Sequence, residues 1–211
     1  MAGLNDDPRE DHSFRLGMLW FIFTEVMFFA AFFGALFYTR VITVPHLGGE
    51  SYGITTHLLL WPSFKATWPL IHLPDPAQFT LMRKAMGAWG IPAMNTLILL
   101  TSGATITLAH WGILKKRHRL AVVGQSLTIV LGLIFLWLQL HEYVEAYQDL
   151  GLRLDSGIYG STFFMLTGFH GLHVTIGTIM LIVILGRILK RHFTPEQHFG
   201  FEAVAWYWHF V

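Results

Sequence analysis

The sequence predicts an all-α protein whose helices cross a lipid bilayer several times. Of its 211 residues, 54% are hydrophobic and only 13% are charged, whereas soluble domains carry about 25% charged residues. Four stretches are apolar over the roughly 20 residues that a helix needs to cross about 30 Å of hydrocarbon. We therefore predict a polytopic transmembrane helix bundle with four full spans and the start of a fifth.

The hydrophobic stretches and their polar flanks give the order of the elements. We predict spans at residues 16–38, 93–114, 120–147 and 158–189, and the start of another at residue 199. The last apolar stretch reaches only to Val211, so it is too short to span and is predicted as the first half of a helix. Residues 1–211 are predicted to form a single transmembrane domain, with a long loop at 41–92.

The second and fourth predicted spans contain small and hydroxyl-bearing residues. The second carries "TSGATIT" and the fourth carries "GFHGLHVTIG". In a bilayer, Gly, Ser and Thr allow helices to approach closely and supply hydrogen bonds between them. Both stretches are therefore predicted to lie at helix–helix contacts.

Lysine and arginine are unevenly distributed between the loops. The turn 115–119, "KKRHR", holds four fixed positive charges, and 186–192, "GRILKRH", is also basic. The loop 145–157 holds one arginine against three acids. Because Lys and Arg concentrate on the cytoplasmic or matrix side, these turns are predicted to be inner. Loop 41–92 is then predicted to face the periplasm or the intermembrane space.

Charge and cysteine content exclude other classes of protein. The net charge of +1 excludes a strongly basic nucleic-acid-binding protein. Without cysteine, the chain cannot build a disulfide, an iron–sulfur cluster or a thiolate metal site from its own residues.

Glu25 is the first candidate functional residue because it lies inside the first predicted span. It is nine residues into that span, or roughly 13 Å along the helix. An unpaired charge at this depth is costly, so we expect Glu25 to be neutral or hydrogen-bonded. Both a structural hydrogen bond and a proton-linked role are open.

A second group of ionisable residues is predicted near the outer surface. His141 and Glu142 end the third span, and His170 and His173 lie three residues apart in the fourth. Imidazole is a common metal ligand, so a membrane metalloenzyme is an alternative interpretation. However, "HEYVE", with Glu145 at its end, lacks the second histidine of a zinc-protease motif, and the remaining histidines are scattered. We therefore predict no metal site.

The basic end of the fourth span is predicted to lie among lipid headgroups. Arg187, Lys190 and His192 follow its apolar residues on the inner side. They can act as a snorkelling anchor that sets topology. They can also form a specific lipid-phosphate site.

Five motifs, in order, resemble subunit III of cytochrome c oxidase, a member of the haem–copper oxidase complexes. They are "GMLWFIFTEVMFF", "MNTLILLTSGATITLAH", "LQLHEYVEAY", "SGIYGSTFFMLTGFHGLHVTIGTIMLIV" and "HFGFEAVAWYWHFV". Together they cover nearly the whole chain outside loop 41–92. The predicted spans resemble helices three to six of the seven-helix fold, and the last fragment resembles the start of helix seven.

The resemblance implies a supporting role rather than a catalytic one. It implies a subunit without a redox centre, packed on subunit I of a proton-pumping aa3-type oxidase of aerobic respiration. Haem a, haem a3, CuB and CuA are then expected in partner subunits I and II, and cytochrome c is expected to donate the electrons. The chain would hold phospholipid and support proton uptake, in a bacterial inner or mitochondrial inner membrane. A respiratory supercomplex is a further candidate partner.

The resemblance also implies roles for individual residues. Glu25 is similar to the carbodiimide-reactive membrane carboxylate of the family, and His170 is similar to a residue that joins it in a polar cluster. His173 is left as packing or as a partner of His141 and Glu142. Arg187 and His192 match positions that contact lipid headgroups.

The chain departs from the family pattern at both ends. It begins just before the third family helix, and it stops before an aspartate that follows "WHFV" in the family. We expect an incomplete chain. Two other functions stay open: subunit III of a quinol oxidase of the same superfamily, and a transporter with Glu25 as a proton relay.

Overall fold

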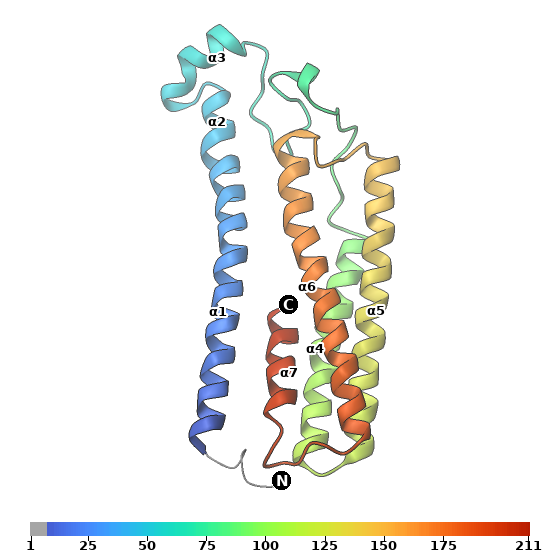
Figure 1. The fold of residues 1–211 in the computed structure, drawn as a ribbon. Coiled ribbons are helices and arrows are strands. Elements are labelled where there is room, and N and C mark those ends of the chain that lie inside the picture. Colours follow the sequence, from blue (N-terminus) through green and yellow to red (C-terminus); the bar gives the residue numbers. More distant parts are fainter. Residues whose placement is uncertain (1–7) are drawn as a thin grey trace. The chain divides into compact units, whose positions relative to one another are not determined.

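The computed structural model describes residues 8–211, and every regular element in that range is a helix (Figure 1). Four helical stretches are long and apolar enough to cross a membrane. The long helices are α1 (Pro8–Tyr38), α4 (Ile91–Leu114), α5 (His118–Gln148) and α6 (Gly157–Leu189), followed by the shorter α7 (Phe199–Phe210). The predicted all-α transmembrane fold is confirmed.

The first membrane-spanning stretch is longer than predicted. After α1 the chain continues through a π-helical turn, η1 (Thr39–Thr43), into α2 (Val44–Leu47). Pro45, which lacks a backbone N–H, lies in the first turn of α2, directly after the π-helical turn. The predicted loop 41–92 therefore begins only at Gly48, and it contains the short helices η2 (Ser51–Gly53), α3 (Ile54–Leu60) and η3 (Pro76–Gln78).

The contacts divide the chain into two compact units. Among the described residues, the first comprises Pro8–Val26, Trp89–Gln139 and His170–Val211. The second comprises Met27–Ala88 and Leu140–Phe169. Helices α1, α5 and α6 each contribute residues to both units. The single-domain assignment stays a prediction.

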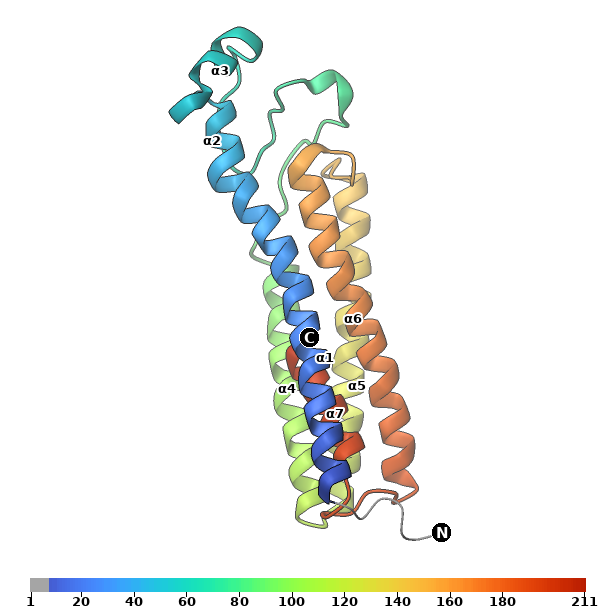
Figure 2. The ribbon, with the colours of Figure 1, turned by 60° about the vertical axis from the view of Figure 1, so that its left-hand side comes forward.

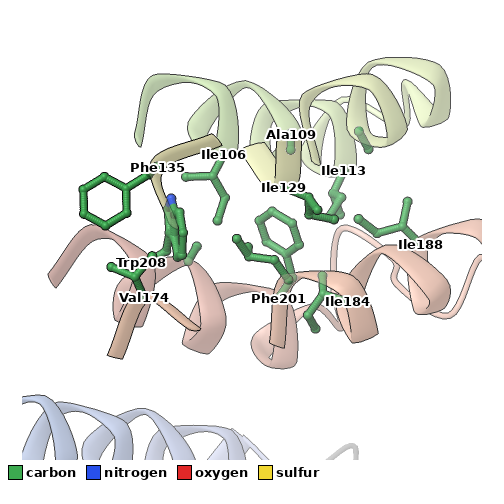
Figure 3. Close-up of a cluster of buried hydrophobic side chains, with 13 residues drawn as sticks. Ile106, Ala109, Ile113, Ile129, Phe135, Val174, Ile184, Ile188, Phe201 and Trp208 are labelled. Atoms are coloured by element: carbon green, nitrogen blue, oxygen red, sulfur yellow. The ribbon is translucent and has the colours of Figure 1, made fainter. Parts of the chain in front are cut away.

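The core of the first unit lies among α4, α5, α6 and α7. Helix α7 packs beside α4, as the two ribbon views agree (Figures 1 and 2). Phe201 and Trp208 of α7 reach into a cluster of buried side chains that includes Ile106, Ala109 and Val174 (Figure 3). In the described part of the chain, this cluster draws no buried residue from α1.

Small residues bring α4 and α5 into close contact. A Cβ added to Gly112 would lie 2.5 Å from the backbone nitrogen of Ala121, and one added to Gly124 would lie 2.9 Å from the nitrogen of Ala109. No larger side chain fits either position without separating the helices. A buried hydrogen bond of 2.7 Å between the hydroxyls of Thr105 and Thr128 joins the same two helices.

The basic ends of α4 and α6 terminate in the same way. Lys116 and Arg191 both adopt φ 55°, which usually favours glycine. The next residue donates its N–H back into the last helical turn, from Arg117 to Gly112 O at 2.7 Å and from His192 to Arg187 O at 3.0 Å. These bonds satisfy carbonyl groups that a helix end would otherwise leave unpaired.

The second unit is held by aromatic rings and by part of the long loop. Phe28 and Phe32 of α1 pack against Phe169, with ring centroids 5.0 and 5.3 Å apart. The loop contributes Met82, which is buried with Ala146 and Leu152. Further hydrogen bonds fix the loop to the α5–α6 turn, among them Thr80 Oγ1 to Asp155 Oδ2 at 2.8 Å.

Candidate functional site

An acid–imidazole pair joins α1 to α6 within the first unit. His173 Nε2 lies 2.8 Å from Glu25 Oε2, at hydrogen-bonding distance. The two side chains are mostly buried, with exposed fractions of 12% for His173 and 20% for Glu25. Glu25 thus has the hydrogen-bonding partner that its position inside a membrane-spanning helix demands.

Helix α7 supplies a ring beside this pair. Tyr207 stacks on the His173 imidazole with centroids 6.4 Å apart, and its hydroxyl donates to the carbonyl oxygen of His173 at 3.3 Å. Phe21 of α1 also stacks on Tyr207, with ring centroids 6.2 Å apart. Residues of α1, α6 and α7 therefore meet at the pair.

The expectation that His170 meets Glu25 is wrong, because His173 occupies that place. Residues three apart on an α-helix differ in direction by about 60°. This rotation is enough to aim the two imidazoles at different neighbours. His170 points toward α5, where its ring meets Phe135 edge-on at 5.6 Å.

The other residues of the predicted polar cluster lie in the second unit. His141 is exposed and Glu142 is half-buried, both near the end of α5. His173 is more than a packing residue, because its Nε2 is bonded to Glu25. Its pairing with His141 and Glu142 stays a prediction.

The basic residues at the end of α6 differ in how firmly they are held. The Arg187 guanidinium lies over the Phe193 ring, 4.6 Å from its centroid. Lys190 and His192 are exposed beyond the last turn. Arg187 thus offers a partly ordered fork of donors that suits a phosphate oxygen pair.

A second ionic cluster was missed by the sequence reasoning. Glu202, at the start of α7, forms an ion pair with Arg15 of α1. Its Oε1 also lies 3.2 Å from His198 Nε2 and 3.6 Å from His110 Nε2. The spacing of four between His198 and Glu202, with His110 next to the basic inner turn, could have indicated this cluster.

Comparison with known proteins decides the family. The chain matches the cytochrome c oxidase subunit III family over residues 6–211. It belongs to that family. It is 43% identical over 204 residues to cytochrome c oxidase subunit 3 of Cyprinus carpio, and 41% identical over 204 residues to that of Gallus gallus. Both alignments cover 97% of this chain and 66% of the relative.

The similarity also extends beyond animals. Cytochrome c oxidase subunit 3 of the alga Prototheca wickerhamii is 41% identical over 197 residues, which cover 93% of this chain and 63% of the relative. The chain therefore spans about two thirds of the length of the relatives that it matches. With four helices able to span a membrane, this member of the family is a multi-pass membrane protein.

Proposed function

We propose that the chain serves as the non-catalytic subunit III of a proton-pumping aa3-type cytochrome c oxidase. The family match along nearly all of the chain is the observation that carries this proposal. In this role the chain packs on subunit I, and subunits I and II hold haem a, haem a3, CuB and CuA. Cytochrome c gives electrons to the complex, in a mitochondrial inner or bacterial inner membrane.

The proposed contribution of this chain is structural and electrostatic. The Glu25–His173 hydrogen bond fixes a polar joint between two membrane-spanning helices. Such a joint can hold the first span, which is otherwise bound mainly by rings and ion pairs, in one register. It keeps a carboxyl group inside the membrane, where it can condition proton uptake by the partner subunit.

Phospholipid binding is the second part of the proposed role. Arg187, with its guanidinium ordered by Phe193, is proposed to contact a lipid phosphate, and Lys190 and His192 are proposed to extend the contact. A basic group at the headgroup level recognises anionic lipid in this way. These residues would then support both topology and lipid retention.

Co-purification tests the proposal. The chain would be tagged in its own organism and isolated in mild detergent. We expect haem-bearing subunits to accompany it, and the preparation to consume oxygen with reduced cytochrome c as donor. Oxidation of a quinol but not of cytochrome c would favour the quinol-oxidase alternative. Isolation of the chain without haem-bearing subunits would contradict both.

The metalloenzyme alternative makes a different prediction. It requires a redox-active metal at His141, Glu142, His170 and His173. In the structure His173 Nε2 is engaged by Glu25, and His141 and Glu142 belong to a different compact unit. Stoichiometric iron or copper in the isolated chain would support that alternative against our proposal.

A further inference from the structure

Three side chains of the first unit converge at the start of α7. His110 lies near the end of α4. His198 directly precedes α7, and Glu202 lies in the first turn of α7. One potential ligand atom from each of the three lies within 4.8 Å of the others. Two imidazoles and one carboxylate form a ligand set that zinc uses in proteins, with a water in the fourth position.

The distances around Glu202 Oε1 match the geometry of a tetrahedral site. Ligand atoms about 2.0–2.2 Å from a zinc ion at tetrahedral angles lie about 3.3 Å apart. Here Oε1 lies 3.2 Å from His198 Nε2 and 3.6 Å from His110 Nε2. The third pair of ligand atoms, one from each imidazole, also lies within 4.8 Å.

Two buried ring nitrogens of this cluster, His110 Nε2 and His198 Nδ1, have no hydrogen-bond partner among the described residues, and His110 Nε2 is the one that faces Glu202. A buried polar atom without a partner costs free energy. A bound cation would be coordinated by His110 Nε2 and would supply the missing partner.

Arg15 contacts the carboxylate oxygen of Glu202 that the two imidazoles do not face. Its guanidinium pairs with Glu202 Oε2, whereas the two imidazoles face Oε1. The ion pair therefore orients the carboxylate and leaves Oε1 directed at the histidines.

From these observations we propose that His110, His198 and Glu202 bind one Zn²⁺ ion. The ion would link the end of α4 to the start of α7, beside the basic turn 115–119 that is predicted to face the inner aqueous phase. Nothing in this proposal depends on the function proposed above. It revises the expectation from sequence that the chain carries no metal site.

Metal titration tests the site in the complex as isolated. After treatment with a chelator, the protein would be titrated with Zn²⁺ and, as a spectroscopic probe, with Co²⁺. We expect one ion per chain, and a visible Co²⁺ band typical of tetrahedral coordination that Zn²⁺ displaces. No saturable binding, or octahedral Co²⁺, would overturn the proposal.

Variants locate the ion. The loss of an outer partner of a metal ligand already weakens binding about 10- to 100-fold, so His110→Ala and Glu202→Gln should each weaken Zn²⁺ binding at least about tenfold. His118→Ala, a half-exposed histidine of the neighbouring turn, should bind as the unchanged protein does. Glu202→Gln preserves volume, so it distinguishes ligand loss from misfolding. Binding that survives both ligand variants would contradict the assignment.

Discussion

The 2.8 Å separation of Glu25 Oε2 and His173 Nε2 joins two helices inside their apolar lengths. Helix α1 adds no buried residue to the described core cluster of the first unit. Its contacts there include the aromatic pairs Phe14–Phe199 and Phe21–Tyr207, the Arg15–Glu202 ion pair, and the Glu25–His173 bond. A small number of polar contacts therefore determines where α1 attaches to the rest of the first unit.

Substitution at Glu25 should separate the hydrogen bond from the charge. Glu25→Gln keeps a hydrogen-bonding group facing His173, so we expect the subunit to remain in its complex. Glu25→Leu leaves the His173 nitrogen without a partner, at a cost of about 1–3 kcal/mol. Subunit retention and detergent-induced unfolding measure both effects, with Met27→Leu on the exposed face as control. Loss of the subunit in Glu25→Gln would show that the ionised carboxylate is structural.

The two histidines of α6 should differ in their effect on Glu25. His173→Leu removes the bonding partner of the carboxyl group, whereas His170→Leu removes a ring that packs against Phe135. Infrared difference spectra, assigned with Glu25→Gln, report the hydrogen bonding of this carboxyl group. We expect the Glu25 band to shift in His173→Leu and to stay in place in His170→Leu. A shift in His170→Leu alone would contradict the pairing.

Two glycines should respond in opposite ways to alanine. A Cβ at Gly112 would overlap the backbone of Ala121, whereas one at Gly186 meets nothing within 4 Å. We expect Gly112→Ala to lower the free energy of unfolding by about 1–3 kcal/mol through overpacking. Gly186→Ala should be neutral or raise it by up to about 1 kcal/mol, since alanine favours the helix. Thermal unfolding in detergent measures both, and equal effects would contradict the close approach of α4 and α5.

Lipid retention should depend on Arg187. Arg187→Gln removes the guanidinium that Phe193 orders, so we expect fewer tightly bound anionic phospholipids per complex by native mass spectrometry. Arg119→Gln, an exposed arginine on α5, serves as the control and should retain them. If the two variants lose lipid equally, the basic end of α6 acts only as a general electrostatic anchor.

The spans could be predicted because hydropathy and length alone decide them. The continuation from α1 to Leu47 could not, because it depends on a π-helical turn that carries the chain past Pro45. Such a turn leaves no periodic signal in a uniformly apolar stretch. Likewise, small residues predicted helix contacts at 101–107 and 168–177, whereas the close approach of Gly112 to Ala121 follows only from the packing of the hairpin.

The sequence identified the types of residue in the candidate site, but it did not identify which histidine bonds to Glu25. Glu25 is conspicuous as an acid in an apolar stretch. The choice between His170 and His173 depends on the rotation of α6 about its axis, which the number of residues between them does not give. The Glu202 cluster was harder still, because His110 and Glu202 are far apart in sequence and meet only when α7 packs beside α4.

Sustained turnover tests the central claim of a supporting subunit most directly. Oxygen consumption and proton pumping would be followed over many catalytic cycles in the complex with this chain, without it, and after adding it back. We expect activity and pumping to decline without the chain and to be restored by its return. Undiminished activity and pumping in the depleted complex would contradict the account.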